Sequence, residues 1–211
     1  HFSEEKAQKL IVGIALVLGV ALAAFLFIFL PTFTIGFIKP LAGRYILRNL
    51  CEGAVRIVIL LVYMKLCSCA KDVKRLFAYH GAEHKTIFCY EKGLELTVEN
   101  VRKQKRFHPR CGTSFMILMI LISIVFSTVV QMIFPDVYNV YWLWVIVKIL
   151  LIPLTCGVGF EVLKICGKYD NFITRIISAP GMWLQRVTTK EPDDGMIEIA
   201  IAALKACNTK E

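Results

Sequence analysis

The stretch that decides the fold class is LIVGIALVLGVALAAFLFIFL, residues 10–30. These 21 residues carry no charge, and about 20 predominantly apolar residues are enough for a helix to cross the hydrocarbon core of a bilayer. A second uncharged run of 21 residues extends from Ser114 to Phe134. A third apolar segment, Tyr141 to Leu163, is long enough to cross but contains charged residues and a proline. The sequence therefore predicts a membrane protein.

The composition leads to the same prediction. With 57% hydrophobic residues and a mean hydropathy of +0.63, the 211-residue chain has more apolar surface than a soluble domain of this size can bury. We predict an all-α, polytopic membrane helix bundle of about four transmembrane helices. Along the chain we expect two membrane helices with an amphipathic outer-leaflet connection at 1–66, a cytoplasmic helical loop at 67–113, two more membrane helices at 114–165, and an amphipathic helical tail at 166–211.

The distribution of the formal charge of +9 predicts how the chain is oriented. Ten Lys and Arg residues lie between Cys67 and Thr113, whereas the connection Pro135 to Val140 has none. Because cytoplasmic loops carry an excess of basic residues, we expect the 67–113 loop and both termini to be cytoplasmic. The segment Cys51 to Ala70 must then cross the membrane as well, although its apolar part is short. The expected location is a cytoplasmic (inner) membrane.

Two helices are predicted within the basic loop. Residues Lys71 to Tyr90 follow the helical period, and Gly81 among them indicates the close approach of another backbone segment, since glycine there costs ~1 kcal/mol relative to alanine. Thr97 is expected to cap a short basic helix from Val98 to Arg106.

Further helix boundaries are predicted near the two ends of the chain. Pro31 is expected to end the first membrane helix, because proline cannot donate to the helical ladder. In the tail, one amphipathic helix is expected at Phe172 to Val187, and a second is expected to begin at Asp193 or Asp194.

The loop also holds three of the four histidines, in two short motifs. In the string YHGAEHK, His80 and His84 lie one helical turn apart, and Glu83 directly precedes the second imidazole. In the string HPRCGTS, His108 and Cys111 have H-x-x-C spacing. Each motif lies next to the end of a membrane helix, so we expect the two motifs to be in contact.

These residue types in this pattern point to a metal site. Two imidazoles at i and i+4 can converge on one ion, and His108 with Cys111 completes a His₃Cys set that suits Zn²⁺. Four protein ligands would make a closed structural site, whereas three plus water would make an open one. A second completion uses Glu161 as a carboxylate ligand, because His-x-x-Glu-His is the ligand order of inverted zincins.

A site without metal is the competing interpretation. In a metal site Glu83 would act as the general base. Without metal, the histidines would cap helices and bond backbone carbonyls or lipid phosphates, and Glu83 would pair with Lys85 or an arginine. Both interpretations stay open on the sequence alone.

Four strings together resemble the YqhQ-like family of bacterial multi-pass membrane proteins. They are YHGAEHK from Tyr79, LTVENVRK from Leu96, HPRCGTS from His108 and TTKEPDD from Thr188. The resemblance implies a multi-pass membrane protein of a family that has no established function and whose members are sometimes labelled predicted metal-dependent enzymes. Family members carry a Gly-Gly-Gln-Ala and Glu-Gly-Val type segment upstream of the first membrane helix, which this sequence lacks, so the resemblance covers only part of any site to which that segment contributes.

The remaining charged residues suggest partners. The basic residues Arg102, Lys103, Lys105 and Arg106 are expected to rest on anionic lipid headgroups, each contributing ~1 kcal/mol near the surface. Ribosomal RNA is the alternative partner for this run, and no specific DNA binding is expected, since interleaved aromatic residues are lacking.

Charged residues in or beside the membrane segments are functional candidates by default. These are Glu52, Arg56, Lys148 and Arg110. In the alternative interpretation Glu52 and Arg56, at i and i+4, form a structural ion pair and Lys148 extends to the membrane interface.

Two functions from different classes follow from these observations. The first is a zinc-dependent hydrolase that acts on membrane-embedded or lipid-linked substrates. The alternative is a non-enzymatic biogenesis or assembly factor, with a client helix, a translocon, a ribosome or a transporter as its partner and with a purely structural histidine cluster. An open coordination position on the metal separates the two.

Overall fold

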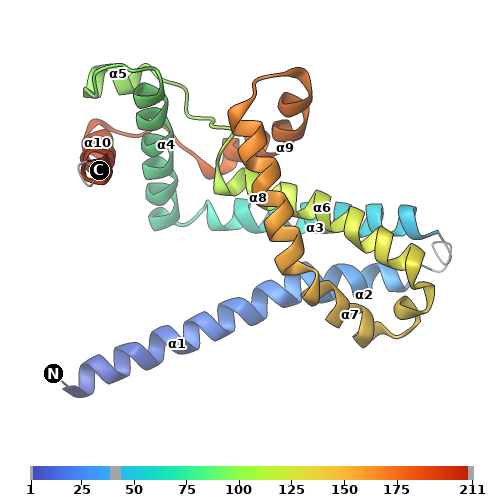
Figure 1. The fold of residues 1–211 in the computed structure, drawn as a ribbon. Helices are drawn as coiled ribbons and strands as arrows, with labels where there is room; N and C mark the ends of the chain where they lie inside the picture. The colour runs from blue at the N-terminus through green and yellow to red at the C-terminus, as the bar shows by residue number, and fades with distance from the viewer. Residues whose placement is uncertain (1, 39–43, 209–211) are drawn as a thin grey trace. The chain divides into compact units, whose positions relative to one another are not determined.

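The computed structural model describes residues 2–38 and 44–208, and this part of the chain is helical without strands (Figure 1). The all-α fold class is therefore confirmed. The elements are α1 (Phe2–Ala24), the π-helical η1 (Phe25–Phe29), α2 (Leu30–Gly36), α3 (Tyr45–Cys67), α4 (Lys71–Glu91), α5 (Val98–Arg102), α6 (Gly112–Ile133), the 3₁₀ helix η3 (Pro135–Asn139), α7 (Tyr141–Leu150), α8 (Ile152–Lys168), α9 (Phe172–Thr188) and α10 (Asp194–Asn208).

The helices include two that are long and apolar enough to cross a membrane, namely Glu4–Gly36 and α6. Two bent pairs of helices, α3 with α4 and α7 with α8, pass the same test jointly, with bends of 106° and 41°. The described residues thus offer two to four spans by length and composition. The apolar side chains of α1 are exposed all around the helix, as lipid-facing side chains are. These helices indicate a membrane protein.

Pro31 does not end the first helix, contrary to the prediction. The helix continues to Gly36, and the π-helical turn η1 ends at Phe29, two residues before the proline. A π turn widens the helical ladder, which accommodates a residue without an N–H group. The hydroxyl of Thr32 donates a hydrogen bond of 2.7 Å to the carbonyl of Ile28 and so satisfies one of the carbonyls near the break.

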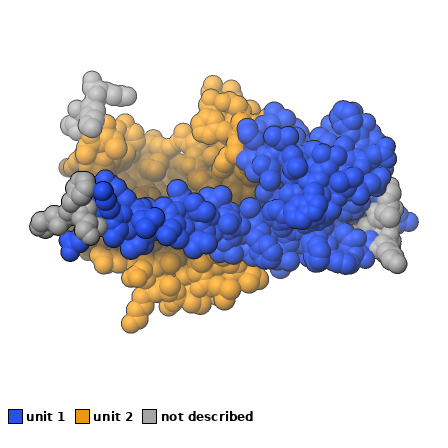
Figure 2. All heavy atoms as spheres, turned by 90° about the horizontal axis from the view of Figure 1, so that it is seen from below, with its two compact units in different colours: residues 1–59, 120–155 blue, residues 60–119, 156–211 orange. Residues whose placement is uncertain are grey.

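The described helices fall into two compact units, which Figure 2 colours differently. Unit 1 comprises residues 1–59 and 120–155, and unit 2 comprises residues 60–119 and 156–211. Each unit therefore combines segments that are distant in sequence. Part of the expected outer-leaflet connection, residues 39–43, lies outside the described residues.

In unit 1, α3 and α6 pack closely where Gly53 faces the side chain of Ile124, which occupies the space that a Cβ at position 53 would need. Polar side chains join the same two helices: Nδ2 of Asn49 donates to Oε1 of Gln131 at 2.8 Å. The hydroxyl of Tyr141 on α7 donates to the carbonyl of Phe29 at 3.3 Å.

In unit 2, α4, α5 and α10 form a small hydrophobic core, and Figure 1 shows α10 beside α4. The core residues are Ala82, Cys89, Val101, Ile197, Ala200 and Ile201. Thr97 caps α5 as predicted and accepts a hydrogen bond from the N–H of Asn100. The two tail helices, α9 and α10, lie where they were predicted. α5 ends at Arg102 rather than Arg106, and the carbonyl of Arg106 instead accepts a hydrogen bond from the ring of His84.

Gly81 lies at a close backbone approach, as predicted. The carbonyl of Lys190 lies against α4 where a Cβ at position 81 would project, and the N–H of Lys190 donates to the carbonyl of Phe77 at 2.8 Å. The segment that follows α9 is therefore fixed on the surface of α4, close to His80.

We predict that Gly81→Ala destabilises the protein, because the new methyl group must displace the Lys190 carbonyl. Overpacking of this kind costs about 1–3 kcal/mol. The midpoint of thermal unfolding of the purified protein in detergent measures the effect. Gly157→Ala is the matched control, since a Cβ at that helical position meets nothing within 4 Å and alanine is the better helix former. A Gly81→Ala protein as stable as the control would contradict the close approach.

Candidate metal centre

His80 and His84 lie on one side of α4, as their spacing requires. Their ring centroids are 4.4 Å apart. His84 is buried and His80 is half-buried. The helix that holds them is bounded by its sequence: Asp72 lies in its first turn, and Gly93, with φ of 65°, follows its end. Both imidazoles are therefore carried by a well-defined helical segment.

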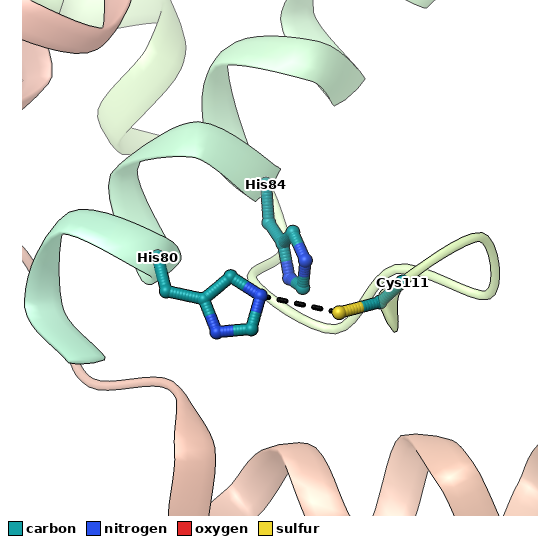
Figure 3. A group of neighbouring side chains, drawn as sticks. All are labelled: His80, His84 and Cys111. Carbon is teal, nitrogen blue, oxygen red and sulfur yellow. Dashed lines mark hydrogen bonds between the residues drawn. The ribbon is translucent and has the colours of Figure 1, made fainter. Parts of the chain in front are cut away.

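Cys111 enters the site from the loop before α6. Its carbonyl accepts a hydrogen bond of 3.1 Å from the N–H of Phe115, so Cys111 lies at the N-terminal end of that helix, where the helix dipole favours a thiolate. Its Sγ lies 3.1 Å from Nε2 of His80. One ligand atom each from His80, His84 and Cys111 lies within 4.8 Å of the others. Figure 3 shows the two rings and the thiol converging from α4 and the loop. The predicted contact between the two motifs is confirmed.

The second nitrogen of each imidazole is bonded to a backbone carbonyl. Nδ1 of His80 lies 2.8 Å from the carbonyl oxygen of Thr188, and Nδ1 of His84 lies 2.5 Å from that of Arg106. Because a carbonyl oxygen can only accept, each Nδ1 carries a hydrogen, so Nε2 is the atom that holds the lone pair whenever the ring is neutral. The two Nε2 atoms and the sulfur are therefore the atoms that could bind a common ligand.

The site also changes the acidity of its groups. Burial raises the pKa of Cys111, but hydrogen bonds with His80, His84 and Thr113 outweigh it and lower the pKa from 9.0 to about 5. Burial lowers the pKa of His80, but its bonds to Cys111 and Thr188 outweigh burial, and the net pKa is raised. Both shifts arise from one bond, in which the thiolate of Cys111 accepts from Nε2 of His80. The thiolate is the form that binds metals, and an ion bound there would take the place of this proton.

His108 lies beside this group but is bonded elsewhere. Its Nδ1 accepts from the N–H of Arg110 at 3.2 Å, so its Nε2 carries the hydrogen that faces Glu91 at 3.3 Å. Its ring packs between His84 and Phe88, at centroid distances of 5.8 and 4.6 Å. Burial and the nearby His84 lower the pKa of His108 to about 4, so its ring is neutral. Of the predicted His₃Cys set, His80, His84 and Cys111 come together. The fourth member, His108, lies beside them with both ring nitrogens bonded to other groups.

Two residues that hold His108 were missed by sequence reasoning. Gln185 on α9 accepts from the N–H of His108 at 2.8 Å and donates to its carbonyl at 2.7 Å, and it donates as well to the hydroxyl of Ser114 at 2.8 Å. Glu91 pairs with the guanidinium of Arg110 in addition to His108. Glu91 lies two helical turns after His84 on α4, a spacing that could have revealed it. No local pattern marks Gln185.

The other predicted site residues of unit 2 lie around the group of three. Glu83 is exposed on α4 directly before His84. Glu161 is exposed on α8 and pairs with Lys164 at 3.2 Å. Arg110 lies against Gly167 of α8. Neither Glu83 nor Glu161 is part of the described group of three potential ligands.

Most of the basic run is held in ion pairs within unit 2. Arg102 pairs with Asp194 at 2.5 Å, Lys103 with Glu99 at 2.6 Å, and Arg106 with Glu191 at 3.0 Å. Lys105 is exposed.

Glu191 also pairs, at 2.8 Å, with the buried Lys85, whose Nζ donates to the carbonyl of Arg102 at 3.0 Å. Lys85 and Arg106 lower the pKa of Glu191. These bonds hold the loop that supplies the Arg106 carbonyl to His84.

The predicted membrane candidates lie in unit 1. Glu52 and Arg56 are buried and form an ion pair of 2.5 Å, as the structural interpretation predicted. Lys148 is 7% exposed, pairs with Glu52, and donates to the hydroxyl of Thr32 at 2.7 Å. The alternative in which Lys148 extends to the membrane interface is therefore wrong, because its ammonium group is bonded inside the unit.

Comparison with known proteins places the chain in a family. Residues 1–210 match the family described as "Protein of unknown function (DUF1385)". The chain is 39% identical over 186 residues to "Uncharacterized protein YqhQ" of Bacillus subtilis (strain 168); the aligned part is 88% of this chain and 57% of that protein. The chain thus spans little more than half the length of this relative. No solved structure matches the chain significantly. The resemblance seen in the sequence motifs is confirmed, and the chain belongs to the DUF1385 family of proteins of unknown function.

Proposed function

We propose that this membrane protein binds a zinc ion through Nε2 of His80, Nε2 of His84 and Sγ of Cys111. The observation that carries the proposal is the bonding of both Nδ1 atoms to backbone carbonyls while both Nε2 atoms are left for one site with a thiolate. Histidines that bind metals have this arrangement, since the second bond fixes the tautomer and the orientation of the ring. Histidines with a purely structural role are not required to direct their Nε2 atoms toward one common position.

The donor set favours zinc and an open site. Two imidazole nitrogens and one thiolate form a borderline-soft set, which suits zinc better than magnesium or calcium. Zinc takes four ligands in structural sites, whereas three protein ligands are typical of catalytic sites. A zinc ion held by these three residues would supply Lewis acidity and would make water a stronger nucleophile at neutral pH. The proposed reaction class is therefore hydrolysis.

Glu83 is the residue of the site that we assign to proton transfer. Its carboxylate is exposed to the medium from which water would enter, and it directly precedes His84 on α4. It is close enough for its charge to contribute to the raised pKa of His80. A carboxylate adjacent to a metal ligand can accept a proton from water and later return it to the leaving group.

The position of helix α9 favours a substrate that lies in the membrane. Its inner side contributes the Thr188 carbonyl to the site, and Gly181 lies against Ser114 in the first turn of the candidate span α6. Because α9 packs on the first turn of a span, it lies at the level where that span would leave the bilayer.

The outer side of α9 is apolar and exposed. Its exposed large side chains are Phe172, Ile173, Ile176 and Trp183. A helix with one apolar side facing outward and arginines beside it, here Arg175 and Arg186, is typical of helices that lie in the membrane interface. A site built on the inner side of such a helix would meet lipid-linked or membrane-embedded substrates.

The metal content of the purified protein tests the proposal. Protein prepared in non-ionic detergent at neutral pH without chelator should contain about one zinc per chain by elemental analysis, and Cys111→Ser or His84→Ala should lose it. Cys69→Ser, which changes an exposed cysteine of the same unit, should keep the metal. His108→Gln should also keep it if only three residues are ligands. Wild-type protein without stoichiometric transition metal would contradict the zinc site and leave the non-enzymatic assembly factor as the better proposal.

The role of Glu83 is tested separately from metal binding. In vesicles made from a total bacterial lipid extract, zinc-loaded protein should release hydrolysis products that mass spectrometry detects. Glu83→Gln should keep zinc and fold normally but slow product release by about 10²–10⁴-fold, the usual contribution of a general base. Glu198→Gln, an exposed glutamate of α10, is the control and should leave the rate unchanged. Equal rates for Glu83→Gln and the wild type would remove Glu83 from the mechanism.

The position of α9 is tested with lipids that carry bromine atoms at defined carbons. Comparing the wild type with Trp183→Phe isolates the fluorescence of Trp183. We expect shallow bromines, near the headgroup, to quench this fluorescence most strongly, because an interfacial helix buries its apolar side only ~5–10 Å deep. Trp142→Phe provides the control for the other exposed tryptophan. Trp183 fluorescence that no brominated lipid quenches would show that α9 faces water or protein instead.

A further inference from the structure

Unit 1 contains a stripe of buried charged residues apart from the histidine site. Arg48, Glu52 and Arg56 follow one another at intervals of four along α3, and they are 8%, 3% and 9% exposed. Lys148 of α7 joins them and is 7% exposed. We call Arg48, Arg56 and Lys148 the cationic cluster.

The cationic cluster has too little negative charge to balance it. Among residues 4–38 and 44–208, Glu52 is the one buried acidic side chain. Its Oε1 already receives Nη2 of Arg56 at 2.5 Å and Nζ of Lys148. Arginine keeps its proton in proteins, so the two guanidinium groups outnumber the single carboxylate even if Lys148 gives up its proton.

The same region contains buried N–H groups that lack acceptors. Within the described part of the chain, Nε of Arg48, Nε of Arg56, Nε2 of Gln131 and Nε1 of Trp144 are buried and have no hydrogen-bond partner. All four are donors. A buried donor without an acceptor and a buried charge without a counter-charge are both costly, most of all in a membrane protein. The cluster therefore lacks acceptor oxygens and negative charge at the same time.

Contacts join these donors into one region of unit 1. The guanidinium of Arg48 stacks on the ring of Tyr138, and that ring lies 5.9 Å from the ring of Trp144. Nζ of Lys148 lies 5.1 Å from the centre of the Trp144 ring. Gln131 is bonded through its oxygen to Asn49, the residue after Arg48, so its free NH₂ group lies beside the stripe.

We propose that the cationic cluster, with Gln131 and Trp144, binds a phosphate group. Planar guanidinium groups pair with phosphate oxygens through charge-assisted bonds, and the indole and amide N–H groups suit the remaining oxygens. A phosphate supplies both the several acceptors and the negative charge that the described residues lack. Its source is either the headgroup of an anionic lipid or free inorganic phosphate. The proposal is independent of the zinc site, because all its residues belong to unit 1.

The test is a thermal-unfolding titration of the 211-residue chain in non-ionic detergent at constant ionic strength. One arm adds inorganic phosphate, a second adds phosphatidylglycerol in mixed micelles, and a third adds phosphatidylcholine, whose choline group offsets the phosphate charge. We expect saturable stabilisation in the first or the second arm, which identifies the source, and a weaker effect in the third. No saturable stabilisation by either phosphate or phosphatidylglycerol would overturn the proposal.

Variants establish that the effect arises in the cationic cluster. Arg48→Gln should lower the affinity at least tenfold, whereas Lys65→Gln, which removes an exposed charge from the same helix, should leave it unchanged. Equal losses in both variants would mean general attraction to positive charge and would also overturn the proposal. If Arg48→Gln does not fold, Trp144→Phe provides the answer, because it removes one N–H group and keeps an aromatic ring. An unchanged affinity in Trp144→Phe would then count against the site.

Discussion

The candidate metal centre depends on two hydrogen bonds, from Nδ1 of His80 to the Thr188 carbonyl and from Nδ1 of His84 to the Arg106 carbonyl. Each bond decides which nitrogen carries the hydrogen, and so leaves the lone pair of Nε2 directed at the region of Cys111. A ring without such a partner would be free to rotate or to change tautomer, and the three potential ligand atoms would not share a point. Both bonds use backbone oxygens, which no side-chain substitution at Thr188 or Arg106 removes directly.

Much of unit 2 serves to bring these two carbonyls to α4. The Thr188 carbonyl comes from the end of α9, and the next residues are fixed on α4 by the contact of Lys190 with Gly81. The Arg106 carbonyl comes from the loop after α5, which Lys85 and Glu191 hold in place. Gln185 then links α9 to the backbone of His108 through two hydrogen bonds. The burial of polar side chains here is stabilising only because each finds a specific partner.

Buried charge is balanced less completely in unit 1 than in unit 2. In unit 2 the buried cation Lys85 reaches a carboxylate and a carbonyl, so its charge is balanced. In unit 1 Arg56 and Lys148 both pair with Glu52, and Arg48 adds a third buried cation. Several buried N–H groups there have no acceptor among the described residues. In a membrane protein there is no bulk water beside the helices to compensate for this. Such an imbalance is what distinguishes a binding region from a purely structural ion pair.

The sequence by itself determined the properties that depend on local spacing. Runs of 21 uncharged residues determined the membrane class, and caps such as Thr97 and Asp193 determined where helices begin. The i, i+4 spacing of His80 and His84 determined that they share a side of α4, and Gly81 revealed a close approach before its partner was known. One local prediction was wrong, namely that Pro31 ends the first helix. The π turn before it accommodates the proline, and the helix continues.

Only the tertiary structure decided which residues meet across long separations. His80 meets the Thr188 carbonyl across 108 positions, and Gln185 meets His108 across 77. The spacing of His108 and Cys111 made both equal candidates, but the bonds of His108 to Arg110 and Glu91 occupy its two nitrogens and leave Cys111 to face the imidazoles. Local sequence patterns carry the periods of helices, whereas the partner of a buried polar group is set by packing between helices. That is why the candidate ligands could be read from the chain and their second partners could not.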